Sequence, residues 1–99
     1  MKGGGCVVDE PALATTAACE QAGVRWSLDL QEATKGHMDG MQQSEIAEAV
    51  AAQCGAGWSD DVTTCLSAGK GKACLAPLTD AQRKTVWSEI KAISPDVRE

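Results

Sequence analysis

The chain has 99 residues, of which 9 are Lys or Arg and 14 are Asp or Glu, so its formal net charge is −5 at pH 7. A chain of this length forms one domain, and a domain this small gains much from extra cross-links. Its basic residues are scattered, whereas binding to nucleic acid or to an anionic membrane needs clustered Lys and Arg. Its apolar runs are only a few residues long, which excludes a transmembrane helix. With 43% hydrophobic residues, three Trp, no Phe and no Tyr, we expect a folded domain.

The N-terminal segment is rich in glycine, because Gly3, Gly4 and Gly5 follow one another. Ordering three glycines costs conformational entropy and buries no side chain. We therefore expect residues 1–8 to be a flexible leader and residues 9–99 to be a single domain. A helix is expected to begin near Asp9, whose side chain can cap it, with Pro11 in the first turn.

Apolar residues then recur at steps of three and four, the period of a helix. Gly23 interrupts this pattern, so we expect a kink or a division into two shorter helices. Lys35 and Gly36 mark the end. One apolar stripe contains Thr15, Cys19, Ala22, Trp26, Leu30 and Ala33, and a neighbouring one contains Leu13, Ala17, Val24 and Leu28.

Three further helices follow from start and stop signals in the second half of the chain. Residues 36–41 are expected to connect to a helix that starts at Ser44 and ends at Gly55. Ser59, followed by the two acidic residues 60–61, predicts a short helix that ends before Gly69. Thr79 with Gln82 is a capping box, and Ser94–Pro95 ends the last helix.

The sequence therefore predicts an all-α fold, a small bundle of about four helices stapled by disulfides. Each tryptophan is expected to anchor the core: Trp26 and Trp87 lie on apolar helix faces, and Trp58 precedes a helix start. No alternating stretch of β-branched residues argues for a sheet.

Four cysteines, at positions 19, 54, 65 and 74, are spread without the close pairs that zinc sites show, which favours structural disulfides. If the first long helix packs antiparallel to the helix ending at Cys54, Cys19 and Cys54 come to the same end. Cys65 would then pair with Cys74. The alternative pairing of residue 54 with 65 and of 19 with 74 stays open, because four cysteines allow three connectivities.

Cys6 is the odd cysteine, separated from the expected helices by the leader. Three interpretations are open for it: a free thiol, a link between chains, or a lipidation site. A mature lipoprotein begins with an acylated cysteine, and the small Gly5 before Cys6 fits such a cleavage site. The apolar segment that precedes such a site is not found in the first residues of this chain.

The spacing from Cys54 through Trp58–Ser59 and Cys65–Leu66 to Cys74, with Cys19–Glu20 ahead of it, resembles small helical cysteine domains of exported proteins and lipoproteins of myxobacteria and related bacteria. The resemblance covers residues 19–78. It implies four structural cysteines and a location outside the cell, in the periplasm or at the outer membrane. It implies no activity, and Cys6 together with the glycine-rich link at 69–71 departs from the pattern.

Enzyme chemistry has little support in this chain, because one histidine in an expected loop supplies no nucleophile, base and orienting group. The carboxylates of Asp60 and Asp61 are explained by their place at a helix start. His37, Met38 and Met41 form a short imidazole and thioether segment, the donor types that bind Cu(I).

We therefore expect a non-enzymatic binding or structural subunit of the bacterial cell envelope or exterior that uses no cofactor. It would act through contacts with a protein partner or by self-association, with a lipid anchor at Cys6 as one form of attachment. The alternative is a small copper-handling protein that uses His37, Met38 and Met41.

Overall fold

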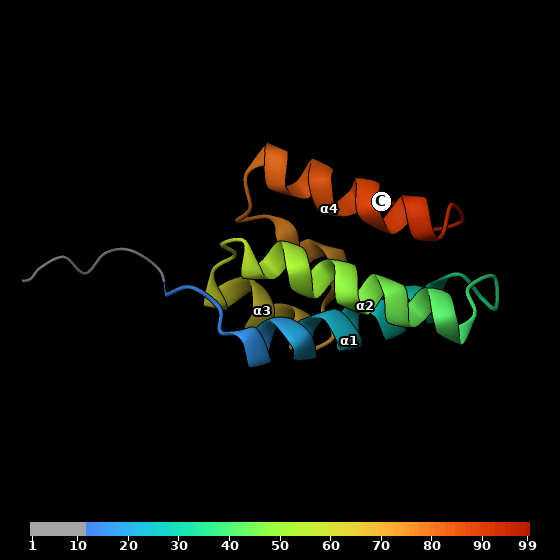
Figure 1. Cartoon of the computed structure of the whole chain (residues 1–99), viewed down its shortest axis with the longest axis horizontal. Helices are drawn as coiled ribbons and strands as arrows, with labels where there is room; N and C mark the ends of the chain where they lie inside the picture. Colours follow the sequence, from blue (N-terminus) through green and yellow to red (C-terminus); the bar gives the residue numbers. More distant parts are fainter. Residues whose placement is uncertain (1–11) are drawn as a thin grey trace, which may run out of the picture.

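The computed structural model describes residues 12–99, which form four α-helices and one 3-10 helix (Figure 1). In chain order the elements are α1 (Thr16–Ala33), α2 (Gly40–Gly55), α3 (Asp60–Ser67), η1 (Gly71–Leu75) and α4 (Asp80–Ile93). The expected all-α fold with about four helices is confirmed. The 3-10 helix η1 was not predicted from the sequence.

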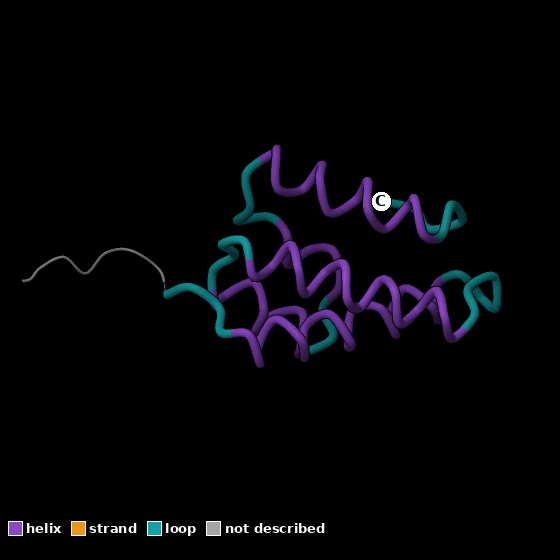
Figure 2. The backbone as a smooth tube through the Cα atoms, in the orientation of Figure 1, coloured by secondary structure: helices purple, strands orange, loops and turns teal. Residues whose placement is uncertain are grey.

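The helices pack around the α1–α2 pair, which is antiparallel (Figure 1). α4 packs on α2, α3 packs on α1, and η1 packs on α3. α2 therefore lies between α1 and α4, as the tube in Figure 2 shows. Helices account for most of the described residues.

The first helix begins later than the sequence suggested. Thr15, not Asp9, is its N-cap, and the Thr15 hydroxyl accepts a hydrogen bond from the Ala18 N–H at 3.1 Å. Asp9 lies outside the described residues, and residues 12–14 are not helical. A threonine oxygen satisfies one of the helix's unpaired N–H groups as well as an aspartate does, so composition alone does not choose between them.

The second helix begins earlier than Ser44, the predicted start. Asp39 is its N-cap, and it forms a reciprocal capping box with Gln42: the Gln42 N–H donates to Asp39 at 2.8 Å, and the Asp39 N–H donates to the Gln42 side chain at 3.0 Å. Gly40 and Met41 are therefore helical, not part of the connection. The two hydrogen bonds outweigh the low helix propensity of Gly40.

Ser59 is the N-cap residue of α3, as predicted, but its side chain makes no capping hydrogen bond. The first N–H of α3 is paired with the chain before α1 instead, because the Asp60 N–H donates to the Ala12 carbonyl at 2.8 Å. The Ala14 N–H donates in turn to the Trp58 carbonyl at 3.0 Å, and we call residues 12–14 with these two hydrogen bonds the strap. The strap attaches the chain before α1 to the start of α3. It explains why residues 12–14 are extended where a helix was expected.

The last helix matches its prediction: Thr79 and Gln82 form the capping box, and α4 ends before Ser94. Arg83 holds this start against the preceding turn. Its guanidinium donates to the Leu78 carbonyl at 2.5 Å and to the Ala76 carbonyl at 3.1 Å, and it pairs with Asp80.

The core is built around tryptophans, as expected for a chain without Phe or Tyr. Trp26 and Trp58 are each 1% exposed and Trp87 is 7% exposed. The rings of Trp26 and Trp87 meet edge to face, with centroids 5.4 Å apart, and so join α1 to α4. The predicted first stripe of α1 is largely buried, with Cys19, Ala22, Trp26 and Leu30 inside, whereas Leu13, Val24 and Leu28 of the second stripe are exposed.

Gly23 neither kinks nor divides α1, which runs unbroken from Thr16 to Ala33. A Cβ at Gly23 would lie 2.5 Å from the carbonyl oxygen of Ala47 and 3.4 Å from the amide nitrogen of Ala51, both on α2. Glycine is therefore required because the backbones of α1 and α2 approach too closely for any side chain at this position.

Gly23→Ala is expected to lower the free energy of unfolding. The better helix propensity of alanine stabilises α1 by about 1 kcal/mol, but the clash with the α2 backbone costs more, about 2–3 kcal/mol. We expect a net loss of about 1–2 kcal/mol in urea denaturation followed by circular dichroism.

Gly55→Ala is the matched control, because a Cβ at the last residue of α2 meets no atom within 4 Å. It should leave stability unchanged or raise it slightly. Equal destabilisation by the two substitutions would contradict the close approach at Gly23.

Candidate functional site

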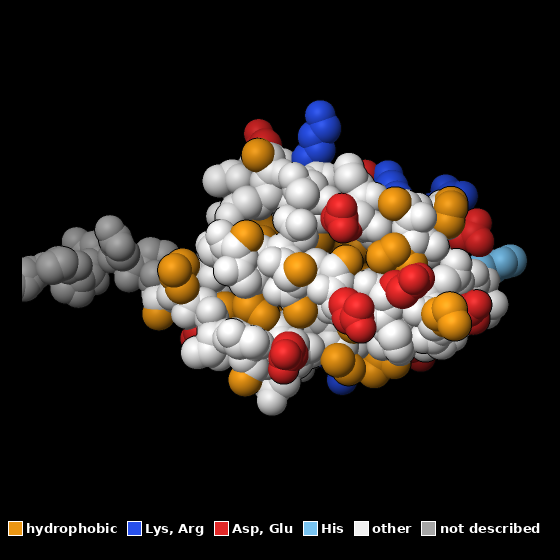
Figure 3. Space-filling model, in the orientation of Figure 1, with side chains coloured by type: hydrophobic (Ala, Val, Ile, Leu, Met, Phe, Trp, Pro, Cys, Tyr) orange, Lys and Arg blue, Asp and Glu red, His pale blue; other side chains and the backbone are white. Residues whose placement is uncertain are grey.

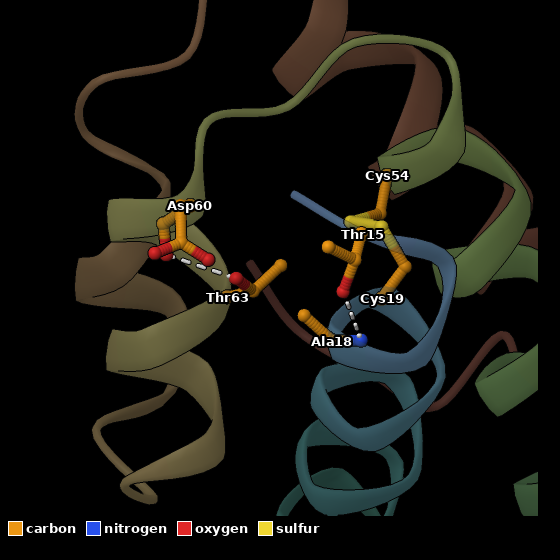
Figure 4. The surroundings of a disulfide bond; sticks show 6 residues. All are labelled: Thr15, Ala18, Cys19, Cys54, Asp60 and Thr63. Atoms are coloured by element: carbon orange, nitrogen blue, oxygen red, sulfur yellow. Dashed lines mark hydrogen bonds between the residues drawn. A yellow bond between two sulfur atoms is a disulfide. The ribbon is translucent and has the colours of Figure 1, made fainter. Parts of the chain in front are cut away.

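Two disulfides join the four cysteines of the described chain: Cys19 with Cys54 and Cys65 with Cys74. This is the first of the two pairings that the sequence left open. Figure 4 shows the Cys19–Cys54 bridge beside the Thr15 cap, where the start of α1 meets the end of α2. The antiparallel packing of α1 and α2 brings these two ends together, as predicted.

The start of α3 lies beside this bridge. Thr63, 1% exposed, donates its hydroxyl to the Asp60 carbonyl at 2.9 Å (Figure 4). One end of the bundle therefore combines a disulfide, the strap and a satisfied buried hydroxyl. Together the bridge and the strap hold the start of α1 to the end of α2 and to the start of α3.

Replacing Cys19 and Cys54 together by serine is expected to cost more stability than replacing Cys65 and Cys74. The bridges span 35 and 9 residues, for which loop entropy gives about 4 and about 2.6 kcal/mol. Urea denaturation of both double variants measures the difference. A larger loss for the Cys65–Cys74 pair would contradict this order.

Structural disulfides form and persist in oxidising compartments. The two bridges therefore indicate an oxidising, non-cytoplasmic environment. Cys6 lies outside the described residues, so its three interpretations stay predictions.

The three residues of the possible copper site, His37, Met38 and Met41, lie in different environments. Met38 is 3% exposed and belongs to the core, whereas Met41 is 75% exposed and His37 is also exposed. His37 instead approaches Asp96, with Nδ1 3.9 Å from Oδ2. Packing against the core accounts for Met38.

The acidic pair at the start of α3 is exposed, and Asp60 and Asp61 occupy the first turn, where their charges favour the helix dipole. Over residues 12–99, no group of three or more His, Cys, Asp or Glu side chains gathers as a metal site would. No helix of this part of the chain is long and apolar enough to cross a membrane.

A groove between α1 and α2 is a surface feature that the sequence did not predict. This α1–α2 groove has a volume of about 490 Å³ and is lined by Glu20, Val24, Ala47, Glu48 and Ala51. Its base consists of alanines because the two helices approach closely there. Val24, which is 48% exposed, forms one wall of the groove. Glu20 and Glu48 lie at the rim of the groove.

The apolar wall continues along α1, because Leu28 lies one turn beyond Val24 and is 46% exposed. Three residues of the predicted second stripe, Ala17, Val24 and Leu28, thus do form a stripe on α1, but it faces solvent, and Leu13 lies before the helix. A sequence pattern gives the period of a stripe and not which of two neighbouring stripes is covered, since that depends on where the other helices pack.

Charge is distributed unevenly around this groove. Residues 12–69 contain eight acidic and two basic side chains, whereas residues 70–99 contain four acidic and six basic ones. Figure 3 shows red acidic side chains across the face formed by α1 and α2, with blue basic side chains along the α4 edge. The groove therefore lies in a negative field.

Comparisons with protein-family models, with curated proteins and with solved structures find no match to this chain. The resemblance of residues 19–78 to exported helical cysteine domains thus rests only on the cysteine spacing and the residues beside it, such as Trp58–Ser59 and Leu66.

Proposed function

We propose that this protein is a non-enzymatic binding module of the bacterial cell envelope or exterior, and that it binds a partner protein through the α1–α2 groove. The observation that carries the proposal is the groove itself: an apolar wall and an alanine base with a glutamate on either helix. Exposed apolar surface rimmed by charge is typical of interaction sites.

The construction of the groove favours a helix as the occupant. Small residues at Ala47 and Ala51 leave room for the side chains of a partner helix, and the apolar wall of Val24 and Leu28 offers contacts spaced one helical turn apart. Such a helix would bury its own apolar stripe there.

Charge defines the chemistry of the partner. Glu20 and Glu48 flank the apolar base, and the surrounding α1–α2 face is acidic. A partner helix with Lys or Arg beside its apolar stripe is complementary, and an acidic one is repelled. A second copy of the acidic α1–α2 face would itself be repelled. We therefore propose a basic partner as the occupant of the groove in preference to self-association.

The disulfides support the proposed location, because an oxidising environment is found in the periplasm, at the outer membrane and outside the cell. Attachment through Cys6, to lipid or to another chain, remains part of the proposal. It would keep the module near the surface where its partner lies.

The test uses two synthetic 16-residue helical peptides with the same leucines and alanines, one carrying lysines and the other glutamates beside the apolar stripe. We expect the lysine peptide to bind at least about tenfold more tightly and more weakly at high salt. Amide shifts at Val24 and Ala51 in heteronuclear NMR spectra would place it in the groove.

Ala51→Lys should weaken binding of the lysine peptide about tenfold, because it fills the base and adds a like charge. Ala52→Lys is the control, since Ala52 is exposed on the same helix but does not line the groove. Equal affinity for both peptides, or equal losses in both variants, would contradict the proposal.

A further inference from the structure

A second hollow lies between the end of α1, η1 and the residues after α4, away from the α1–α2 groove. It has a volume of about 500 Å³. Its apolar floor is formed by Leu30 and Val97, which are 8% and 3% exposed. We call it the Lys72–Arg98 hollow after the two cations at its rim.

These two cations come from distant parts of the sequence, and the fold brings them to one rim. Among the residues that the structure describes, neither Lys72 nor Arg98 forms an ion pair. The carboxylate of Glu99, next to Arg98, is held by Lys91 at 2.6 Å. The acid of the hollow, Asp96, instead lies 3.9 Å from His37.

The Lys72–Arg98 hollow thus combines two cations, neither of them in an ion pair within residues 12–99, with an apolar floor, and its single carboxylate is that of Asp96. A guanidinium binds a carboxylate through two parallel hydrogen bonds, and a lysine adds a point charge. The floor would take an alkyl chain out of water. Inorganic anions would use only the first of these two features.

We propose that the Lys72–Arg98 hollow binds a small organic carboxylate, with its carboxylate between Lys72 and Arg98 and its alkyl chain over Leu30 and Val97. The ligand class is a short aliphatic acid. This site is separate from the protein-binding groove, so either proposal can fail without the other.

Titration of the protein with hexanoate, followed by heteronuclear NMR, tests this proposal, with 1-hexanol and inorganic phosphate as comparison probes. Hexanoate should give saturable amide shifts at Leu30 and Val97 with a dissociation constant on the order of millimolar, since the hollow is open to water. Each comparison probe should bind at least about tenfold more weakly, because each lacks one of the two features.

Lys72→Gln and Arg98→Gln should each weaken hexanoate binding about tenfold, the effect of losing one charge-assisted hydrogen bond. Lys84→Gln is the matched control, because it removes the same charge from α4 outside the hollow. Circular dichroism verifies that each variant keeps its helices.

Three results would overturn the proposal. The first is the absence of saturable shifts up to about 50 mM hexanoate, which lies far above the expected range. The second is equal affinity for phosphate or for hexanol. The third is a loss in Lys84→Gln as large as in the two hollow variants, which would mean that only net charge matters.

Discussion

The close approach of α1 and α2 at Gly23 determines the rest of the fold. With no side chain there, the α1 backbone comes within contact distance of the Ala47 carbonyl. This spacing lets Cys19 and Cys54 meet at one end of the pair, and the small residues Ala47 and Ala51 lie opposite Gly23. The same small side chains form the shallow base of the α1–α2 groove. A packing requirement inside the bundle has thus produced a surface feature outside it.

The ends of the bundle are held by different means. Where the chain enters α1, the strap to α3 and the Cys19–Cys54 bridge act together. Between η1 and α4, the Arg83 side chain holds the turn by donating to the Ala76 and Leu78 carbonyls. Both solutions fix short connections in a protein whose core is small.

Local signals predicted much of this structure. The capping box at Thr79, the stop at Gly55 and the buried tryptophans follow from residue chemistry over a few positions, and the cysteine pairing follows from antiparallel packing. The errors have a common cause. Each missed feature depends on a hydrogen bond or contact with one particular partner, as at the start of α2 at Asp39, in the strap and at Gly23. The helix propensities of single residues carry no information about such partners.

The candidate sites were harder to predict for a related reason. Val24 and Leu28 were identified as an apolar stripe, but their exposure depends on where α3 and α4 pack. Lys72 and Arg98 are 26 positions apart in the sequence, and no local pattern relates them. Both proposed sites arise from the packing of the helices and not from any local sequence motif.

The uneven charge has a consequence for the rate of association. Eight acidic and two basic side chains in residues 12–69, against four and six in residues 70–99, give the molecule a permanent electric dipole. A cationic partner would be oriented during its diffusional approach, so that it meets the α1–α2 face first. Such steering acts over about one Debye length, roughly 8 Å at physiological ionic strength. Encounter would therefore be selective before any apolar contact has formed.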